Sequence, residues 1–61
     1  MTYSELKKLL KKNGCYFLRE GGNHDIWYSP ITNRQFPVGR HESQEVRRGT
    51  FQSIKKQAGI K

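Results

Sequence analysis

The sequence predicts a two-layer α+β sandwich of αβββα order, with a three-stranded antiparallel sheet covered on one face by two helices. Apolar residues recur at helical spacing near both ends of the chain, over 2–13 and 51–58. Between them lie three short runs rich in aromatic and β-branched residues, over 15–20, 24–29 and 34–38. The turns between these runs are short, so neighbouring strands must be antiparallel. Both helices then need the same apolar sheet face, which gives two layers.

The first helix is expected over residues 2–13. Thr2 and Glu5 have the capping-box spacing, in which each side chain satisfies a free main-chain N–H group. The apolar stripe of this helix comprises Tyr3, Leu6, Leu9 and Leu10. Gly14 is expected to end the helix because glycine adopts the left-handed conformation at little cost.

A glycine-containing turn separates the first two expected strands. Residues 21–23, Gly-Gly-Asn, tolerate positive φ and predict this turn. In the second strand the period of two places His24, Ile26 and Tyr28 on one face and Asp25 and Trp27 on the other. If Trp27 faces the helices, His24 lies on the open face of the sheet, just past the turn.

The third strand and the last helix complete the expected fold. Pro37 has no N–H for a ladder hydrogen bond, so the strand over 34–38 is expected at a sheet edge. The polar segment 39–49 is expected to be a loop, followed by a helix with Thr50 as its N-cap and Gly59 as its end. The expected core comprises Leu6, Leu9, Leu10, Phe17, Trp27, Phe36, Val38, Phe51, Ile54 and Ala58, with Cys15 as a small buried residue.

Size and charge narrow the classes of function. The 61 residues have room for one domain, over 1–61, and for no large enzyme scaffold. Twelve Lys and Arg against five Asp and Glu give a net charge of +7, which favours a polyanionic partner such as nucleic acid or an anionic membrane surface. The longest apolar run, over 15–18, is far shorter than the roughly 20 residues of a membrane span. We also expect no signal peptide, because no apolar segment follows a basic start.

The single cysteine bears on compartment and chemistry. One cysteine forms no internal disulfide, and a small domain without disulfides is typical of a reducing compartment, so we expect a cytoplasmic protein. Neither a cysteine pair nor an HExxH motif occurs, so we expect no metal and no cofactor.

Three segments, in order along the chain, resemble HicA-type mRNA interferase toxins. Residues 21–24, Gly-Gly-Asn-His, before an aromatic strand, resemble that family's Gly-Ser-His segment, and residues 38–41, Val-Gly-Arg-His, resemble its Val-Pro-Arg-His segment. Residues 48–60, with Arg-Gly-Thr-Phe and Gln-Ala-Gly-Ile, resemble its closing helix. The sequence departs from the family at three places: Asn23 replaces Ser, Gly39 replaces Pro, and Glu42-Ser43 replaces Pro-Gly.

The resemblance implies a fold, an activity and a partner. The fold is similar to that of double-stranded-RNA-binding domains, in the same αβββα order. The activity is cleavage of mRNA centred on one histidine, which His24 matches. The partner is a HicB-type antitoxin that covers the site, and operator DNA would be contacted only through that antitoxin. No membrane partner is implied.

The chemistry of RNA suits such a residue. RNA carries its own nucleophile, the 2′-OH, so cleavage needs proton transfer rather than a metal. Histidine suits this role because its unperturbed pKa is about 6.5, and a positioned acid–base group contributes roughly 10²–10⁴-fold. Taken with the resemblance, this chemistry predicts that His24 is catalytic; the alternative, which the residues alone would favour, is a structural histidine that caps the turn.

Neighbouring residues are predicted to position the substrate. Gly22 would let the RNA backbone approach His24, or serve only as a turn glycine. Asn23 would cap the turn and donate hydrogen bonds. His41 is a second proton-transfer group or a phosphate contact. Tyr28 could supply a hydroxyl, stack on an unpaired base, or be an ordinary aromatic of the sheet face.

The basic side chains form the broadest signal. The candidate phosphate contacts are Lys7, Lys8, Lys11, Lys12, Arg40, Arg47, Arg48, Lys55 and Lys56. As a set they favour contact with nucleic acid and would equally suit an acidic antitoxin surface, whereas any single one of them is expected to lie on a solvated helix surface. Two further functions therefore remain open beside the nuclease: a non-catalytic RNA-binding module of the same fold, and a basic protein-interaction domain. Neither requires a histidine after the glycine turn.

Overall fold

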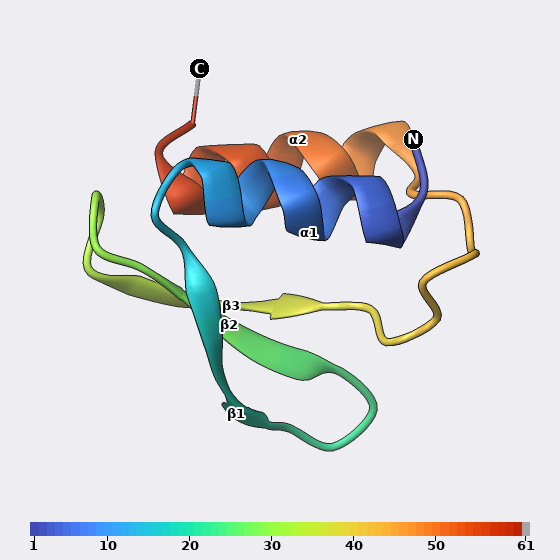
Figure 1. Ribbon diagram of the computed structural model, residues 1–61, viewed down its shortest axis with the longest axis horizontal. Coiled ribbons are helices and arrows are strands. Elements are labelled where there is room, and N and C mark those ends of the chain that lie inside the picture. The colour runs from blue at the N-terminus through green and yellow to red at the C-terminus, as the bar shows by residue number, and fades with distance from the viewer. Residues whose placement is uncertain (61) are drawn as a thin grey trace.

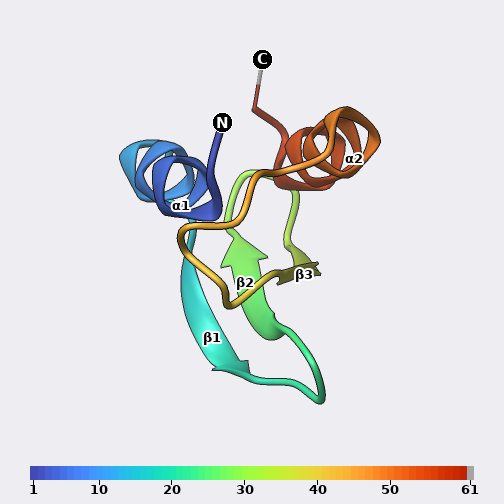
Figure 2. The same cartoon turned by 90° about the vertical axis from the view of Figure 1, so that its right-hand side faces the viewer.

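The computed structural model describes residues 1–60 and has the expected element order. The elements are α1 (Tyr3–Lys12), β1 (Tyr16–Glu20), β2 (Asp25–Ser29), β3 (Arg34–Val38) and α2 (Arg48–Ala58). The sheet has the order β1-β2-β3, and both strand pairs are antiparallel. Both helices lie on one face of this sheet (Figure 1, Figure 2). The predicted α+β sandwich is therefore confirmed, including the edge position of the strand that contains Pro37.

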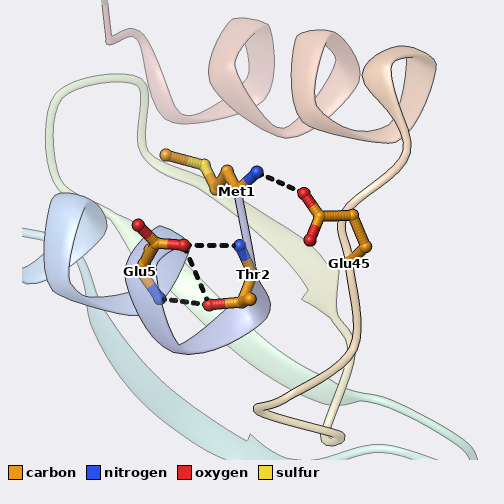
Figure 3. A network of polar contacts seen from close by, with 4 residues as sticks. All are labelled: Met1, Thr2, Glu5 and Glu45. Atoms are coloured by element: carbon orange, nitrogen blue, oxygen red, sulfur yellow. Dashed lines mark hydrogen bonds and ion pairs between the residues drawn. The ribbon is translucent and has the colours of Figure 1, made fainter.

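Helix α1 begins at the predicted capping box. The Thr2 hydroxyl accepts a hydrogen bond from the Glu5 N–H at 3.3 Å, and the Glu5 carboxylate accepts one from the Thr2 N–H at 2.9 Å (Figure 3). These bonds, first from the Thr2 main chain and then from its side chain, lower the pKa of Glu5. Gly14, at φ +88°, follows the last turn in the left-handed conformation, as predicted.

The core lies between the helices and the sheet. Its buried apolar residues are Leu6, Leu10, Cys15, Trp27, Phe36, Val38, Val46, Ile54 and Ala58. Leu9 and Phe51, also expected in the core, are only half-buried, and Phe51 packs against this cluster. Val46 was not expected in the core, because it lies in a polar segment without periodicity. Within residues 1–60, neither helix is long and apolar enough to cross a membrane.

Phe17 was expected in the core, and that prediction is wrong. Its side chain is 49% exposed, although its main chain pairs with that of buried Trp27. The reason is its place at the sheet edge: all five residues of β1 are exposed, and the register shifts between Phe17 and Arg19. Apolar character identified a strand there but not which strand the helices would leave uncovered.

Helix α2 begins earlier than predicted. Its N-cap is Arg47 rather than Thr50, and Thr50 lies inside the first turn. The Arg47 carbonyl accepts the Phe51 N–H at 2.8 Å, but no side chain caps this end. A search for a Ser, Thr, Asp or Asn cap therefore finds the wrong residue, and α2 begins three residues earlier than expected. Gly59 ends the helix at φ +76°, as predicted.

Two hydroxyl groups fasten the end of α2 to the sheet. Ser29 on β2 is fully buried and donates to the Ala58 carbonyl at 2.6 Å. Thr32, in the β2–β3 turn, donates to the Gln57 carbonyl at 2.5 Å. The last carbonyl groups of a helix lack partners within the helix, so these bonds give donors to the Gln57 and Ala58 carbonyls, of which the Ala58 bond is buried.

Candidate active site

His24 lies in the turn between β1 and β2, one residue before β2 begins. Its side chain is exposed, and this turn is the part of the sheet farthest from both helices (Figure 1, Figure 2). The turn is closed by main-chain groups, since the Gly21 N–H donates to the His24 carbonyl at 2.9 Å. The closing bond does not involve the imidazole, so the turn does not rely on this ring as a cap.

The two glycines of the turn have different roles. A Cβ on Gly21 would lie 2.8 Å from the His24 carbonyl oxygen and 3.1 Å from the Ile26 side chain, so a larger residue has no room there. A Cβ on Gly22 would meet nothing within 4 Å. Neither glycine has a positive φ, so the expected left-handed turn is not what selects them. Gly21 is needed for space, and Gly22 leaves the approach to the turn open.

Arg40 fastens this turn to the loop after β3. Its Nε donates to the Asp25 carboxylate at 2.9 Å, and its Nη2 donates to the Gly21 carbonyl at 2.5 Å. A longer contact of 3.5 Å joins Nη2 to the His24 carbonyl. Arg40 was predicted to contact phosphate, but its guanidinium already binds groups of Gly21, His24 and Asp25. The role of Asp25 was missed, although an acidic residue directly after His24 in so basic a chain was a usable signal.

The loop that carries His41 is held from its other side by the start of α1. The Tyr3 N–H donates to the Gln44 carbonyl at 3.0 Å, and the Val46 N–H donates to the Met1 carbonyl at 2.8 Å. The Met1 ammonium pairs with the Glu45 carboxylate, which raises the pKa of that amino group (Figure 3). His41 itself is exposed and directly follows Arg40 in this anchored loop.

Gly39, a departure from the resembled family, is explained by packing. A Cβ at this position would lie 2.8 Å from the Tyr3 ring. Because Gly39 has no side chain, the Tyr3 ring of α1 can pack directly against the main chain at the end of β3. This packing fixes the start of the loop that carries His41.

Tyr28 lies on the open face of the sheet, away from the helices. Its hydroxyl donates to the Asn33 side chain at 2.7 Å, which fixes the ring. Tyr16 on β1 is directly opposite, with ring centroids 5.5 Å apart and an angle of 48° between the rings. Sequence reasoning missed Tyr16, because its pairing with Tyr28 depends on the register of the two strands.

The structure does not bring the helical lysines and arginines to His24. Lys7 is largely covered and lies 3.8 Å from the Glu42 carboxylate, and Lys55 lies over the Phe51 ring at 5.8 Å. The exposed members of the predicted set on and beside the helices are Lys8, Lys11, Lys12, Arg47, Arg48 and Lys56. They belong to the helical layer, whereas the β1–β2 turn projects from the opposite side (Figure 2).

The arrangement can therefore offer one exposed imidazole on a braced turn to a large substrate. Within the described chain, residues 1–60, no three His, Cys, Asp or Glu side chains gather as metal ligands.

The family model described as the HicA toxin of bacterial toxin-antitoxin matches residues 3–60. Neither a curated protein nor a solved structure matches the chain.

Proposed function

The chain belongs to the HicA toxin family of bacterial toxin–antitoxin systems, and from this we propose that it is a metal-independent endoribonuclease that cleaves mRNA with His24. The observation that carries the proposal is the exposed imidazole on a turn held by Gly21 and Arg40. An exposed turn gives a polymer access that a closed pocket would not.

The reaction is an internal transesterification. The 2′-oxygen of one nucleotide attacks the neighbouring phosphorus, the bond from phosphorus to the 5′-oxygen breaks, and a 2′,3′-cyclic phosphate and a free 5′-OH result. His24 takes the proton from the 2′-OH or gives one to the departing 5′-oxygen, which is worth roughly 10²–10⁴-fold.

A second group must carry the other proton. The Tyr28 hydroxyl already donates to Asn33, and Tyr28 lies four residues along the chain from His24, about 13 Å in an extended strand. We therefore assign the second role to water or to His41, in the anchored loop next to Arg40. Gly22 and Asn23 line the approach of the RNA backbone to His24.

The exposed lysines and arginines of the helical layer have a different role from His24 in this proposal. The exposed helical cations are too far from the turn to act on the cleaved phosphate, so they hold distant phosphates or an acidic protein surface. A HicB-type antitoxin neutralises the toxin by covering His24, and operator DNA is contacted only through that antitoxin. An mRNA substrate places the protein in the cytoplasm.

Inducible expression tests this function. We expect growth arrest and new mRNA ends from the wild type, relief of both by the cognate antitoxin, and neither from His24→Ala. In vitro, cleavage should continue in excess chelator. Growth arrest without new RNA ends, or RNA binding without cleavage, would instead support the non-catalytic module.

A further inference from the structure

We propose that Tyr16 and Tyr28 form a stacking platform for unpaired bases of single-stranded RNA on the open face of the sheet. This inference rests on the proposed function, in which RNA is the substrate. It adds the surface that holds the RNA and the form of RNA that this surface accepts.

The two rings are arranged in advance for such contact. Tyr16, the first residue of the edge strand β1, is 48% exposed, and the centroid of its ring lies 5.5 Å from that of Tyr28. The bond from Tyr28 to Asn33 holds the second ring in place. Binding to a surface whose side chains are already ordered avoids much of the entropy cost of ordering them.

The same face leads from the platform to His24. Tyr28 and Ile26 are two residues apart in β2, so their side chains lie on this same face. Arg19 lies there too, because it is paired with Ile26. Arg19 therefore places a positive charge between the rings and the turn. The distance from Tyr28 to the turn, about 13 Å along an extended strand, spans a few nucleotides.

The chemistry of this face favours single strands over duplexes. Side chains stack on bases only where the bases are unpaired and splayed out, because bases in a duplex stack on one another. The net charge of +7 and the position of Arg19 suit a phosphate backbone beside the rings. Tyrosine rings accept any base, so the platform selects strandedness rather than sequence.

Binding assays on the inactive His24→Ala protein test the platform. The probes are an unstructured labelled RNA, an abasic strand of equal length, and a hairpin duplex. Tyr16→Ala should weaken binding of the unstructured RNA about 5- to 150-fold and leave the abasic strand unaffected. Tyr16→Phe should bind normally, since the ring remains.

Phe17→Ala is the matched control. Phe17 is the next residue, is equally exposed at 49%, and pairs with Trp27 rather than Tyr28, so it should not affect RNA binding. Arg19→Ala should reduce the salt slope by about 0.7, whereas Tyr16→Ala should leave it unchanged.

The platform would be overturned by any of three results: equal losses with abasic RNA, an effect of Phe17→Ala as large as that of Tyr16→Ala, or a loss of antitoxin binding alone. These assays need no cleavage. If the wild type failed to cleave but its binding depended on Tyr16 and on bases, the nuclease would be rejected and the platform retained.

Discussion

The Arg40 guanidinium and the Asp25 carboxylate are joined at 2.9 Å, directly beside His24. Arg40 comes from the loop after β3 and Asp25 from the start of β2, so the pair connects two segments that are distant in sequence. Both side chains are partly exposed, at 40% and 19%, so we expect this ion pair to contribute little to global stability. Its effect is local, because the same guanidinium also holds the Gly21 carbonyl.

Arg40→Ala should impair cleavage without unfolding the protein. Loss of the guanidinium frees the turn, and misplacing a catalytic group by about 1 Å costs up to about 100-fold. We expect cleavage to fall about 10- to 100-fold and the Gly21 amide to exchange faster with solvent. Rate measurements and hydrogen exchange check both effects. Arg34→Ala, which removes an exposed arginine of β3, is the control; equal losses in both variants would mean that Arg40 acts only through its charge.

Substitutions of the two turn glycines should distinguish the steric requirement at Gly21 from the approach of RNA over Gly22. Gly21→Ala should destabilise the protein by about 1–3 kcal/mol, because its Cβ meets the His24 carbonyl oxygen. Gly22→Ala should change stability by less than about 0.5 kcal/mol. It should nevertheless slow cleavage if RNA approaches over this residue. Chemical denaturation and cleavage assays on the pair decide; normal cleavage by Gly22→Ala would remove Gly22 from the substrate path.

Ser29→Ala should weaken the attachment of α2 to the sheet. The substitution leaves the buried Ala58 carbonyl without its donor, which costs about 1–3 kcal/mol. The melting temperature should fall by about 4–8 °C per kcal/mol. Ser43→Ala, in the exposed loop, should melt like the wild type. Identical melting of the two variants would contradict a stabilising role for the buried bond.

The capping box predicts an acid-dependent loss of stability. Hydrogen bonds from Thr2 lower the pKa of Glu5 from its ordinary value of 4.5, so the unfolded chain takes up this proton more readily than the folded one. The contribution of Glu5 is therefore present above pH 4.5 and lost as the pH falls through the folded pKa. Melting curves of Glu5→Gln should lie below those of the wild type near neutral pH and converge with them in acid. Glu20→Gln controls for the loss of one negative charge, and a pH-independent difference for Glu5→Gln would argue against the charge of the cap.

Sequence reasoning identified what local patterns determine. Strand periodicity, the capping box at Thr2 and the glycine ends of both helices are local features, and the structure has them. The prediction that Phe17 is buried was wrong because burial depends on which strand the helices cover. The prediction that Thr50 caps α2 was wrong because this helix begins without a side-chain cap. Both are tertiary properties that propensity does not encode.

Only part of the candidate site could be predicted from the sequence, because the rest of it also depends on tertiary structure. His24 could be singled out because its segment is short and continuous. The Arg40–Asp25 pair and the Tyr16–Tyr28 pair each join separate segments, so they depend on loop path and strand register. A search for charged partners near His24 could have found Asp25, whereas nothing local distinguishes Tyr16.

Cleavage of a defined RNA by purified His24→Ala tests the proposed mechanism most directly. We expect the rate to fall about 10²- to 10⁴-fold, with RNA affinity and melting temperature close to those of the wild type. Wild-type products should carry 2′,3′-cyclic phosphates. Cleavage by His24→Ala within a few-fold of the wild-type rate would show that His24 does not transfer the proton.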